Sequence, residues 1–191
     1  MITAFASPST YVQGDQLLQH AARYIAPFGN RGLLIADDTV WELVGGQFYH
    51  HLTADGLKIE HIHFKGESSP EEIARIQAIG AAKDAKFVIA LGGGKTNDTT
   101  KAVGDQLHVP VVIVPTLASN DSPCTRLSVI YSPNGEFLKY QFYNKNPDLV
   151  LVDSTVIAGA PVRFLVDGIA DALSTNVEAQ TVARARATTL L

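Results

Sequence analysis

The sequence has a single cysteine, little net charge and no long apolar segment. Cys124 is alone among 191 residues, so an internal disulfide is excluded, and we expect a reducing, cytoplasmic environment. The start, MITAFASPSTYVQG, lacks the basic and then apolar segments of a secretory signal. No apolar run approaches the ~20 residues that span a bilayer, so the sequence predicts no membrane segment.

The net charge of −4 gives no electrostatic reason to expect a nucleic acid or an anionic membrane as partner. Hydrophobic residues make up 46% of the chain and charged residues 18%, which is a globular rather than a disordered composition. A chain of this length suits one ordinary domain and can bury a core.

Short apolar runs alternate with amphipathic helical patterns through the first two thirds of the chain. Ser69 is a predicted N-cap with Pro70 in the first helical position, and Gly45 and Gly46 interrupt an earlier helix. Strands that alternate with helices predict a Rossmann-like parallel sheet with helices on both faces. The predicted strands are 31–38, 57–64, 86–92 and 109–116, and the predicted helices are 14–29, 38–52, 68–83 and 96–107.

After Thr116 the regular alternation of predicted strands and helices ends. Residues 126–143 read as a β-hairpin that turns at Ser132-Pro133-Asn134-Gly135 and lies on the sheet. A further strand leads into a short helix over 147–157, and residues 161–191 read as helical throughout. This last helix reaches Leu191 without a glycine, a proline or a clear cap, which favours the hypothesis that the natural protein or its coding sequence was cut.

Gly92, Gly93 and Gly94 lie between a buried strand and a helix, followed by Lys95 and Thr96. The first amides of a helix lack partners and its dipole favours anions, so this loop is a predicted phosphate site. A plain strand-to-helix turn is the alternative. The loop is neither a P-loop, which would need a glycine at position 89, nor the G-x-G-x-x-G fingerprint, which would need one at position 97.

Asp37 lies at the carboxyl end of an early predicted strand, where open α/β sheets bind ligands. An acid there accepts both hydroxyls of an adenine ribose and repels a 2′-phosphate, which favours NAD over NADP. Asp37 or Asp38 could instead cap the next helix, and the two roles can coexist because there are two acids. Since the acid precedes the glycine loop, the arrangement is a variant of the ordinary Rossmann unit.

Four segments in order resemble the glycerol dehydrogenase branch of the so-called iron-containing alcohol dehydrogenase family, a branch that uses zinc. They are LGGGKTNDTTKAVGD, VPVVIVPTLASNDSPCTRLSVIYSPNGEF, NPDLVLVD and PVRFLVDGIADAL. The resemblance implies an NAD-binding α/β domain over 1–160 and, over 161–191, the start of an all-helical domain that is otherwise absent. It also implies that NAD-dependent oxidation of glycerol, or of a related small polyol, to dihydroxyacetone occurs between the two domains by zinc-assisted hydride transfer.

The same resemblance assigns roles to individual residues. Asp121 matches the acid beside the glycerol hydroxyls, and Asp171 matches the first zinc ligand, so both are candidate catalytic residues. The cofactor-binding residues that it implies are Asp37, Gly93, Gly94, Lys95, Thr96, Asp98, Thr116, Leu117, Ser119, Thr125, Leu127 and Tyr131.

A catalytic zinc takes three protein ligands as a rule, and in the family the other two are histidines in the helical domain. All six histidines of this chain precede Asp171, and none lies in a matching context. His61 and His63 would share one strand face, but we expect ordinary strand residues there. If the 191 residues are the whole protein, we expect no bound catalytic zinc and little or no turnover.

The substrate side departs from the family pattern at several positions, which are Asn97, Asn120, Ser122, Arg126, Ala170 and Asn176. Cys124 has no histidine in its loop to activate it, so packing is a better interpretation than a nucleophile. These departures put the substrate contacts in doubt more than the glycine loop.

Three functions therefore remain open. The chain could be the nucleotide-binding half of a glycerol dehydrogenase, or a naturally short protein that binds NAD or pairs with another subunit without catalysis. It could also belong to a sister enzyme of the same fold, for which a phosphorylated substrate would need more basic residues than Arg126 near Asp121. An apolar stripe of the last helix predicts association, most simply a homo-oligomer, through Leu165, Ile169, Ala172, Leu173 and Val177.

Overall fold

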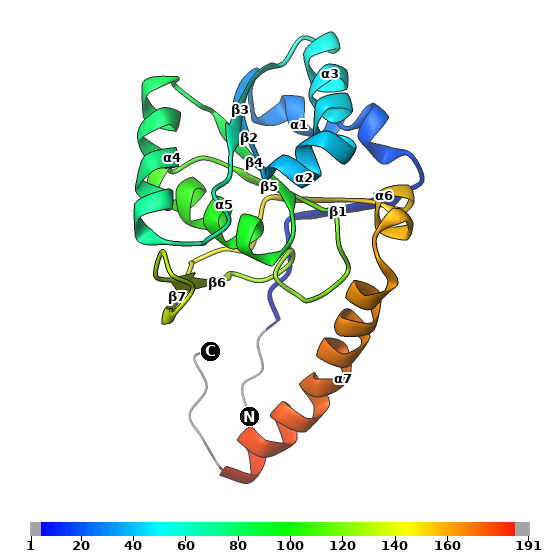
Figure 1. Cartoon of the computed structure of the whole chain (residues 1–191), viewed down its shortest axis with the longest axis vertical. Helices are drawn as coiled ribbons and strands as arrows, with labels where there is room; N and C mark the ends of the chain where they lie inside the picture. Colours follow the sequence, from blue (N-terminus) through cyan, green and yellow to red (C-terminus); the bar gives the residue numbers. More distant parts are fainter. Residues whose placement is uncertain (1–4, 186–191) are drawn as a thin grey trace.

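The computed structural model describes residues 5–185. A six-stranded sheet in the order β1-β8-β5-β4-β2-β3 forms its centre, and every neighbouring pair of strands is parallel (Figure 1). Its strands are β1 (Thr10–Gly14), β2 (Arg31–Ala36), β3 (Lys58–His63), β4 (Phe87–Gly92), β5 (Val111–Pro115) and β8 (Leu149–Asp153).

Helices cover both faces of the sheet, which confirms the predicted Rossmann-like α/β class. One face packs against the segments η1 (Leu17–His20), α1 (Ala22–Ile25), η2 (Ala26–Phe28), α2 (Asp38–Val40), η3 (Trp41–Gly45) and α3 (Gly46–Ala54). The other packs against α4 (Pro70–Ala82) and α5 (Gly94–Leu107). Every residue of β4 and β5 is buried, which explains why these strands are continuous apolar runs without alternation.

The helix ends follow local sequence chemistry. The hydroxyl of Ser69 accepts a hydrogen bond from the amide of Glu72 and Pro70 opens α4, so the predicted cap is confirmed. Around Gly45 the helix is not broken but forms a wide π turn. A β-carbon at Gly45 would lie 2.7 Å from the ring of Trp41, so only glycine lets this turn pack against the tryptophan.

The predicted hairpin is present as β6 (Leu127–Tyr131) and β7 (Phe137–Phe142), but it does not join the six-stranded sheet. The two strands form a separate antiparallel pair, and β6 packs against α5. Most of β7 is exposed, including Phe137, Tyr140 and Phe142. The expectation of a hairpin lying directly on the sheet is therefore wrong, because α5 occupies that position.

The chain leaves the sheet through α6 (Ser154–Gly159) and continues in α7 (Val162–Ala185), which projects away from the body of the molecule (Figure 1). The prediction of a helix from 161 to 191 extends over residues 186–191, which lie outside the described residues. Within the described part of the chain, no helix combines the length and the apolar character that crossing a membrane requires.

Candidate nucleotide site

The strand order places a crevice between β2 and β4. From β2 the chain moves outward to β3 and then returns to the other side of β2 as β4, so the connections leave in opposite directions at this point. Open α/β sheets bind ligands at such a reversal, outside the carboxyl ends of the strands. Asp37 follows β2 and Gly93 follows β4, so both lie at this edge.

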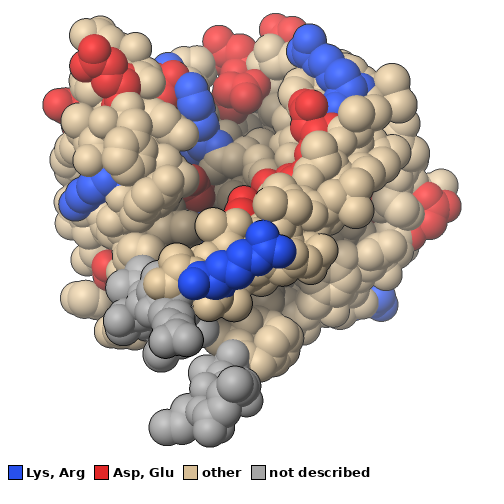
Figure 2. All heavy atoms as spheres, turned by 90° about the horizontal axis from the view of Figure 1, so that it is seen from below, with Lys and Arg blue, Asp and Glu red and all other residues tan. Residues whose placement is uncertain are grey.

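A cavity of about 1090 Å³ occupies this edge and is lined by the loops after β2, β3, β4, β5 and β8. Its size suits a dinucleotide-sized ligand. Seen from the side of α7, this part of the surface is hollowed, with acidic and basic side chains around the hollow (Figure 2). Seven residues assigned to the cofactor line the cavity, which are Asp37, Gly93, Gly94, Lys95, Thr96, Thr116 and Leu117.

The glycine loop forms the floor of this cavity. Gly93 is the N-cap of α5 and offers no side chain to its first amides, so these remain free for a ligand. A β-carbon at Gly92 would lie 2.7 Å from the hydroxyl of Thr96, and one at Gly94 would lie 3.1 Å from Asn120. The three glycines therefore allow close packing behind the loop and an open, positively polarised helix end in front of it.

Lys95 extends from the first turn of α5 to the edge of the cavity. Its ammonium lies 2.5 Å from Oε1 of Glu67 and 5.5 Å from the ring centre of Tyr131. Oε2 of Glu67 is buried without a hydrogen-bond partner among the described residues. The lysine is half exposed, so it can contact an anion in the cavity while Glu67 holds it in place.

The two acids after β2, Asp37 and Asp38, make different contacts. Oδ1 of Asp37 accepts a hydrogen bond of 2.8 Å from the amide of Val40, so Asp37 is the N-cap of α2. Its other oxygen remains available to the cavity that it lines. Asp38 lies 2.8 Å from Nδ1 of His63, which also lines the cavity, while His61 stacks on Trp41 with ring centres 3.5 Å apart. Capping and ribose recognition by Asp37 therefore remain compatible.

Thr116 directly follows β5, and its amide donates a hydrogen bond to the carbonyl oxygen of Gly92. The residue is 6% exposed, and its Oγ1 has no hydrogen-bond partner among the described residues. Since a buried hydroxyl without a partner is costly, this oxygen is a candidate contact for a bound ligand. Leu117 follows it and packs over Gly93.

The other predicted residues lie outside the cavity lining. Asp121 lies in the loop over 116–126, and Asp171 lies on α7. Surrounding protein desolvates the Asp121 carboxyl, and the charge of Asp171 repels it, so both effects raise the pKa of Asp121. The two residues expected on the substrate side therefore influence each other electrostatically, although 50 residues separate the two positions.

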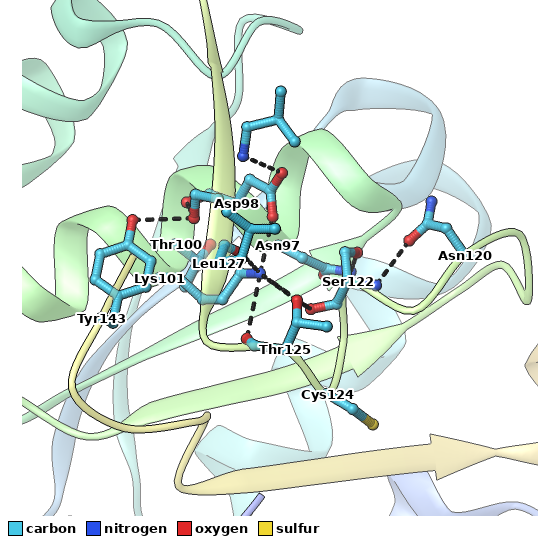
Figure 3. Close-up of polar contacts among 12 residues, drawn as sticks. Asn97, Asp98, Thr100, Lys101, Asn120, Ser122, Cys124, Thr125, Leu127 and Tyr143 are labelled. Carbon is cyan, nitrogen blue, oxygen red and sulfur yellow. Dashed lines mark hydrogen bonds and ion pairs between the residues drawn. The ribbon is translucent and has the colours of Figure 1, made fainter. Parts of the chain in front are cut away.

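Asp98 faces β6 rather than the cavity. Its carboxylate lies 2.9 Å from the ammonium of Lys101 and accepts a hydrogen bond from the amide of Val129 (Figure 3). Burial raises the pKa of Asp98 and lowers that of Lys101, and the ion pair opposes both shifts. Lys101 is absent from the sequence-based assignment, although an acid and a lysine three residues apart on one helix were a signal for such a pair.

The residues around the 116–126 loop contact one another and the start of the hairpin. Thr125 offers both its hydroxyl and its carbonyl oxygen to Lys101, and the carbonyl oxygen of Leu127 accepts from the same ammonium. Ser119 accepts from the side-chain amide of Asn120. Tyr131 lies beneath Lys95. These residues shape the loop and the hairpin beside the cavity.

Three departures from the family pattern contact one another where α5 meets this loop. The side-chain amide of Asn97, on α5, donates a hydrogen bond of 3.1 Å to the hydroxyl of Ser122. Asn120 accepts a further hydrogen bond from the amide of Ser122. Three positions that differ from the family pattern thus form one polar contact group, so they are changes that fit together.

The described residues do not fit a complete zinc site. No group of three or more histidine, cysteine, aspartate or glutamate side chains within 5–185 is arranged to hold a metal ion. Asp171 has Asp121 as its acidic neighbour, and two carboxylates are fewer than the three protein ligands that a catalytic zinc takes as a rule.

The sequence is similar to those of several characterised oxidoreductases. It is 44% identical over 184 residues to a glycolaldehyde reductase from Halobacterium salinarum, covering 96% of this chain and 50% of the relative. It is 45% identical over 181 residues to a glycerol dehydrogenase from Thermotoga maritima, covering 94% of this chain and 49% of the relative. The chain therefore spans about half the length of the curated relatives that it matches.

The fold agrees with these similarities. The crystal structure of a glycerol dehydrogenase from Schizosaccharomyces pombe, 38% identical, superposes with a TM-score of 0.87 over 95% of this chain and 46% of that one. The model of the iron-containing alcohol dehydrogenase family matches residues 8–154. On these grounds the chain belongs to the iron-containing alcohol dehydrogenase family.

Proposed function

We propose that the cavity at the carboxyl edge of the sheet binds NAD, with the diphosphate at the amino end of α5. The observation that carries this proposal is the free helix end at Gly93 and Gly94, which opens into a cavity of dinucleotide size. Lys95 adds a positive charge at the same end. A plain strand-to-helix turn would not need a cavity in front of it.

In this proposal, the residues around the helix end contact different parts of the cofactor. Asp37 keeps one carboxylate oxygen free and accepts the ribose hydroxyls, and its charge disfavours a 2′-phosphate. Thr116 supplies the unpartnered hydroxyl. Ser119 belongs with Thr116 and Leu117 to the segment that wraps NAD, and Thr125, Leu127 and Tyr131 line the nicotinamide end.

We further propose that the site serves an oxidoreductase that acts on a small hydroxylated substrate. The relatives named above act on glycerol and glycolaldehyde, and these substrates share adjacent oxygen-bearing carbons. When bound, NAD takes up the hydride that leaves the carbinol carbon, and the hydroxyl proton is released. Asp121 hydrogen-bonds the substrate hydroxyls, and its raised pKa lets it hold a proton more readily than an ordinary aspartate.

The division into an NAD-binding part over 1–160 and the beginning of a helical part over 161–191 belongs to the same proposal. In it, Asp171 contributes one metal ligand in the complete enzyme. Because the described residues offer no further ligands, we expect this 191-residue chain to bind zinc poorly and to turn over slowly or not at all.

One observation favours a second function, which is NAD binding or subunit pairing without catalysis. The stripe predicted on α7 is exposed, with Leu165 at 50%, Leu173 at 70% and Val177 at 64% exposure. Apolar surface of this kind is typical of an interface, and a homo-oligomer is its simplest form.

Calorimetric titration of the 191-residue chain with NAD, followed by a glycerol-dependent NAD reduction assay with and without added zinc, tests the proposed NAD site and the expected weak activity. Saturable NAD binding with little turnover supports both. Saturable binding with robust turnover would overturn the expectation of weak activity. The absence of NAD binding at millimolar concentration would overturn the proposed function as a whole.

A further inference from the structure

We propose that Lys101 is a positioning residue, whose buried ammonium holds the 116–126 loop in the conformation that presents Asp121. The inference deepens the proposed function, since the position of Asp121 matters for catalysis only if that residue faces the substrate. No role for Lys101 follows from the sequence pattern or from the names of the relatives.

The loop has no regular structure of its own, because residues 116–126 form neither helix nor strand. Its conformation must therefore come from contacts with neighbouring elements. Lys101 supplies most of the contacts in the second half of the loop (Figure 3), where Asn97 also donates to Ser122 and Asn146 to the carbonyl oxygen of Cys124. Its ammonium lies 3.0 Å from the carbonyl oxygen of Ser122, 3.4 Å from the hydroxyl of Thr125 and within hydrogen-bond distance of the carbonyl oxygen of Leu127.

These partners are chemically matched to a lysine. An ammonium has three donors and no acceptor, and every one of these partners is an oxygen acceptor. The Lys101 side chain is 3% exposed, so water cannot replace it as donor. Asp98, one helical turn earlier, compensates the buried charge at 2.9 Å.

If Lys101 contacted only Asp98, the ion pair would stabilise α5 and would give no reason to assign Lys101 a role in the loop. What distinguishes Lys101 is that its remaining contacts all go to the loop and to the first residue of β6, on either side of Cys124. Asp121 immediately precedes this contact region, and the charge of Lys101 opposes the effects that raise the Asp121 pKa. The contacts of the ammonium with Ser122, Thr125 and Leu127 therefore fix the position of Asp121.

Cys124 provides a reporter for this loop, because it is the only cysteine of the chain and is partly buried. Burial and the charge of Asp121 raise the pKa of its thiol, and Lys101 lowers it. The rate of iodoacetamide alkylation, measured by mass spectrometry across the pH range in which the thiol titrates, gives two quantities. The limiting rate at high pH reports the accessibility of the loop, and the midpoint reports the local charge.

The test compares Lys101→Met with Leu52→Ala in the 191-residue chain. Leu52 is on α3 and is buried in the core on the other face of the sheet, so its truncation destabilises the fold without touching the loop. For Lys101→Met we expect a limiting alkylation rate on the order of tenfold higher, as loss of a charge-assisted hydrogen bond predicts, and a higher thiol pKa. For Leu52→Ala we expect neither change.

A double variant, Lys101→Met with Asp98→Asn, covers the case in which the uncompensated Asp98 prevents folding. The introduced asparagine is neutral and keeps an acceptor for the amide of Val129, so the fold is retained while the loop loses its donor. The inference predicts fast alkylation in this variant too. Alkylation as slow as in the unaltered chain, in the folded double variant or in folded Lys101→Met, would overturn it.

A parallel NAD titration separates this inference from the proposed function. Lys101 does not line the nucleotide cavity, so we expect NAD binding to persist in Lys101→Met. An unaltered chain that fails to bind NAD would overturn the proposed function, and the alkylation rates would still decide the role of Lys101. Loss of NAD binding in Lys101→Met with unchanged alkylation would place Lys101 in the cofactor site instead of the loop.

Discussion

Gly168 of α7 packs against the backbone of Ala118, so closely that a β-carbon at Gly168 would lie 2.0 Å from the carbonyl oxygen of Ala118. The contact joins α7 to the loop that carries Asp121. Asp171 lies one helical turn after Gly168, on the helix that this contact holds against the loop, and burial and the charge of Asp171 both raise the pKa of Asp121. Gly168 and Lys101 therefore both contribute to the geometry on the proposed substrate side.

The first prediction concerns this glycine. Gly168→Ala forces α7 away from the 116–126 loop, because backbone on the other side of the contact cannot yield as a flexible side chain would. We expect α7 to become more susceptible to limited proteolysis and the pKa of Asp121 to fall. Gly159→Ala is the matched control, since a β-carbon there meets nothing within 4 Å. Equal proteolysis of both variants would contradict the packing described for α7.

The second prediction concerns the pKa of Asp121. Asp171→Asn removes the charge that, after burial, contributes most to raising this pKa, so the pKa falls toward that of an ordinary aspartate. Glu178→Gln has a smaller effect in the same direction, because Glu178 is the weaker contributor. Carbon-13 NMR titration of the carboxyl groups measures both. An unchanged Asp121 titration in Asp171→Asn would show that the two carboxylates do not interact.

The same shift makes stability depend on pH. Because the folded-state pKa of Asp121 lies above its unfolded value of about 3.9, folding takes up a proton between these two values. The contribution of Asp121 to stability is therefore greatest below this window and is lost as pH rises through it. Urea unfolding of the unaltered chain and of Asp171→Asn across the window should show a shallower loss in the variant.

The third prediction concerns the charge beside the glycine loop. Lys95→Met removes the cation and leaves Glu67 as an anion beside the diphosphate, so we expect NAD affinity to fall about tenfold. Glu67→Gln removes the competing anion and should raise affinity by a few-fold. Because Lys95 is half exposed, both effects should shrink with added salt. Calorimetric titration measures both affinities. If Lys95→Met raised the NAD affinity and Glu67→Gln lowered it, a diphosphate at this position would be excluded.

The fourth prediction separates the two roles of Asp37. Asp37→Ser keeps an oxygen to cap α2 but removes the charge, so stability should change little while discrimination against NADP weakens. Asp37→Ala loses the cap as well and should cost about 1 kcal/mol of stability. Thermal unfolding measures the first effect and competitive titration with NAD and NADP the second. Undiminished rejection of NADP by Asp37→Ser would remove Asp37 from the ribose site.

The fold could be predicted largely from the sequence because its signals are local. Fully apolar strands, the Ser69 cap and the triple glycine each follow from the preferences of a few neighbouring residues. The position of the hairpin could not be predicted, since nothing within 126–143 indicates that it packs against α5. The π turn at 41–45 was also missed, because the sequence shows a glycine pair that fits a helix break equally well.

The candidate site, like the fold, could be predicted only where its sequence signals are local. The glycine loop and Asp37 were predictable because each sits at the end of a recognisable strand. The loop contacts of Lys101 were not, because these partners lie more than 20 residues later and only the packing of β6 against α5 brings them together. The contact between Asn97 and Ser122 could not be predicted for the same reason, although both residues differ from the family pattern.

The central claim is that the amino end of α5 holds a dinucleotide diphosphate, and a crystal structure of the chain grown with NAD tests it most directly. The account predicts diphosphate oxygens within hydrogen-bond distance of the amides of Gly94 and Lys95, with the adenine ribose beside Asp37. NAD bound elsewhere, or an empty cavity under conditions where calorimetry shows saturation, would contradict it.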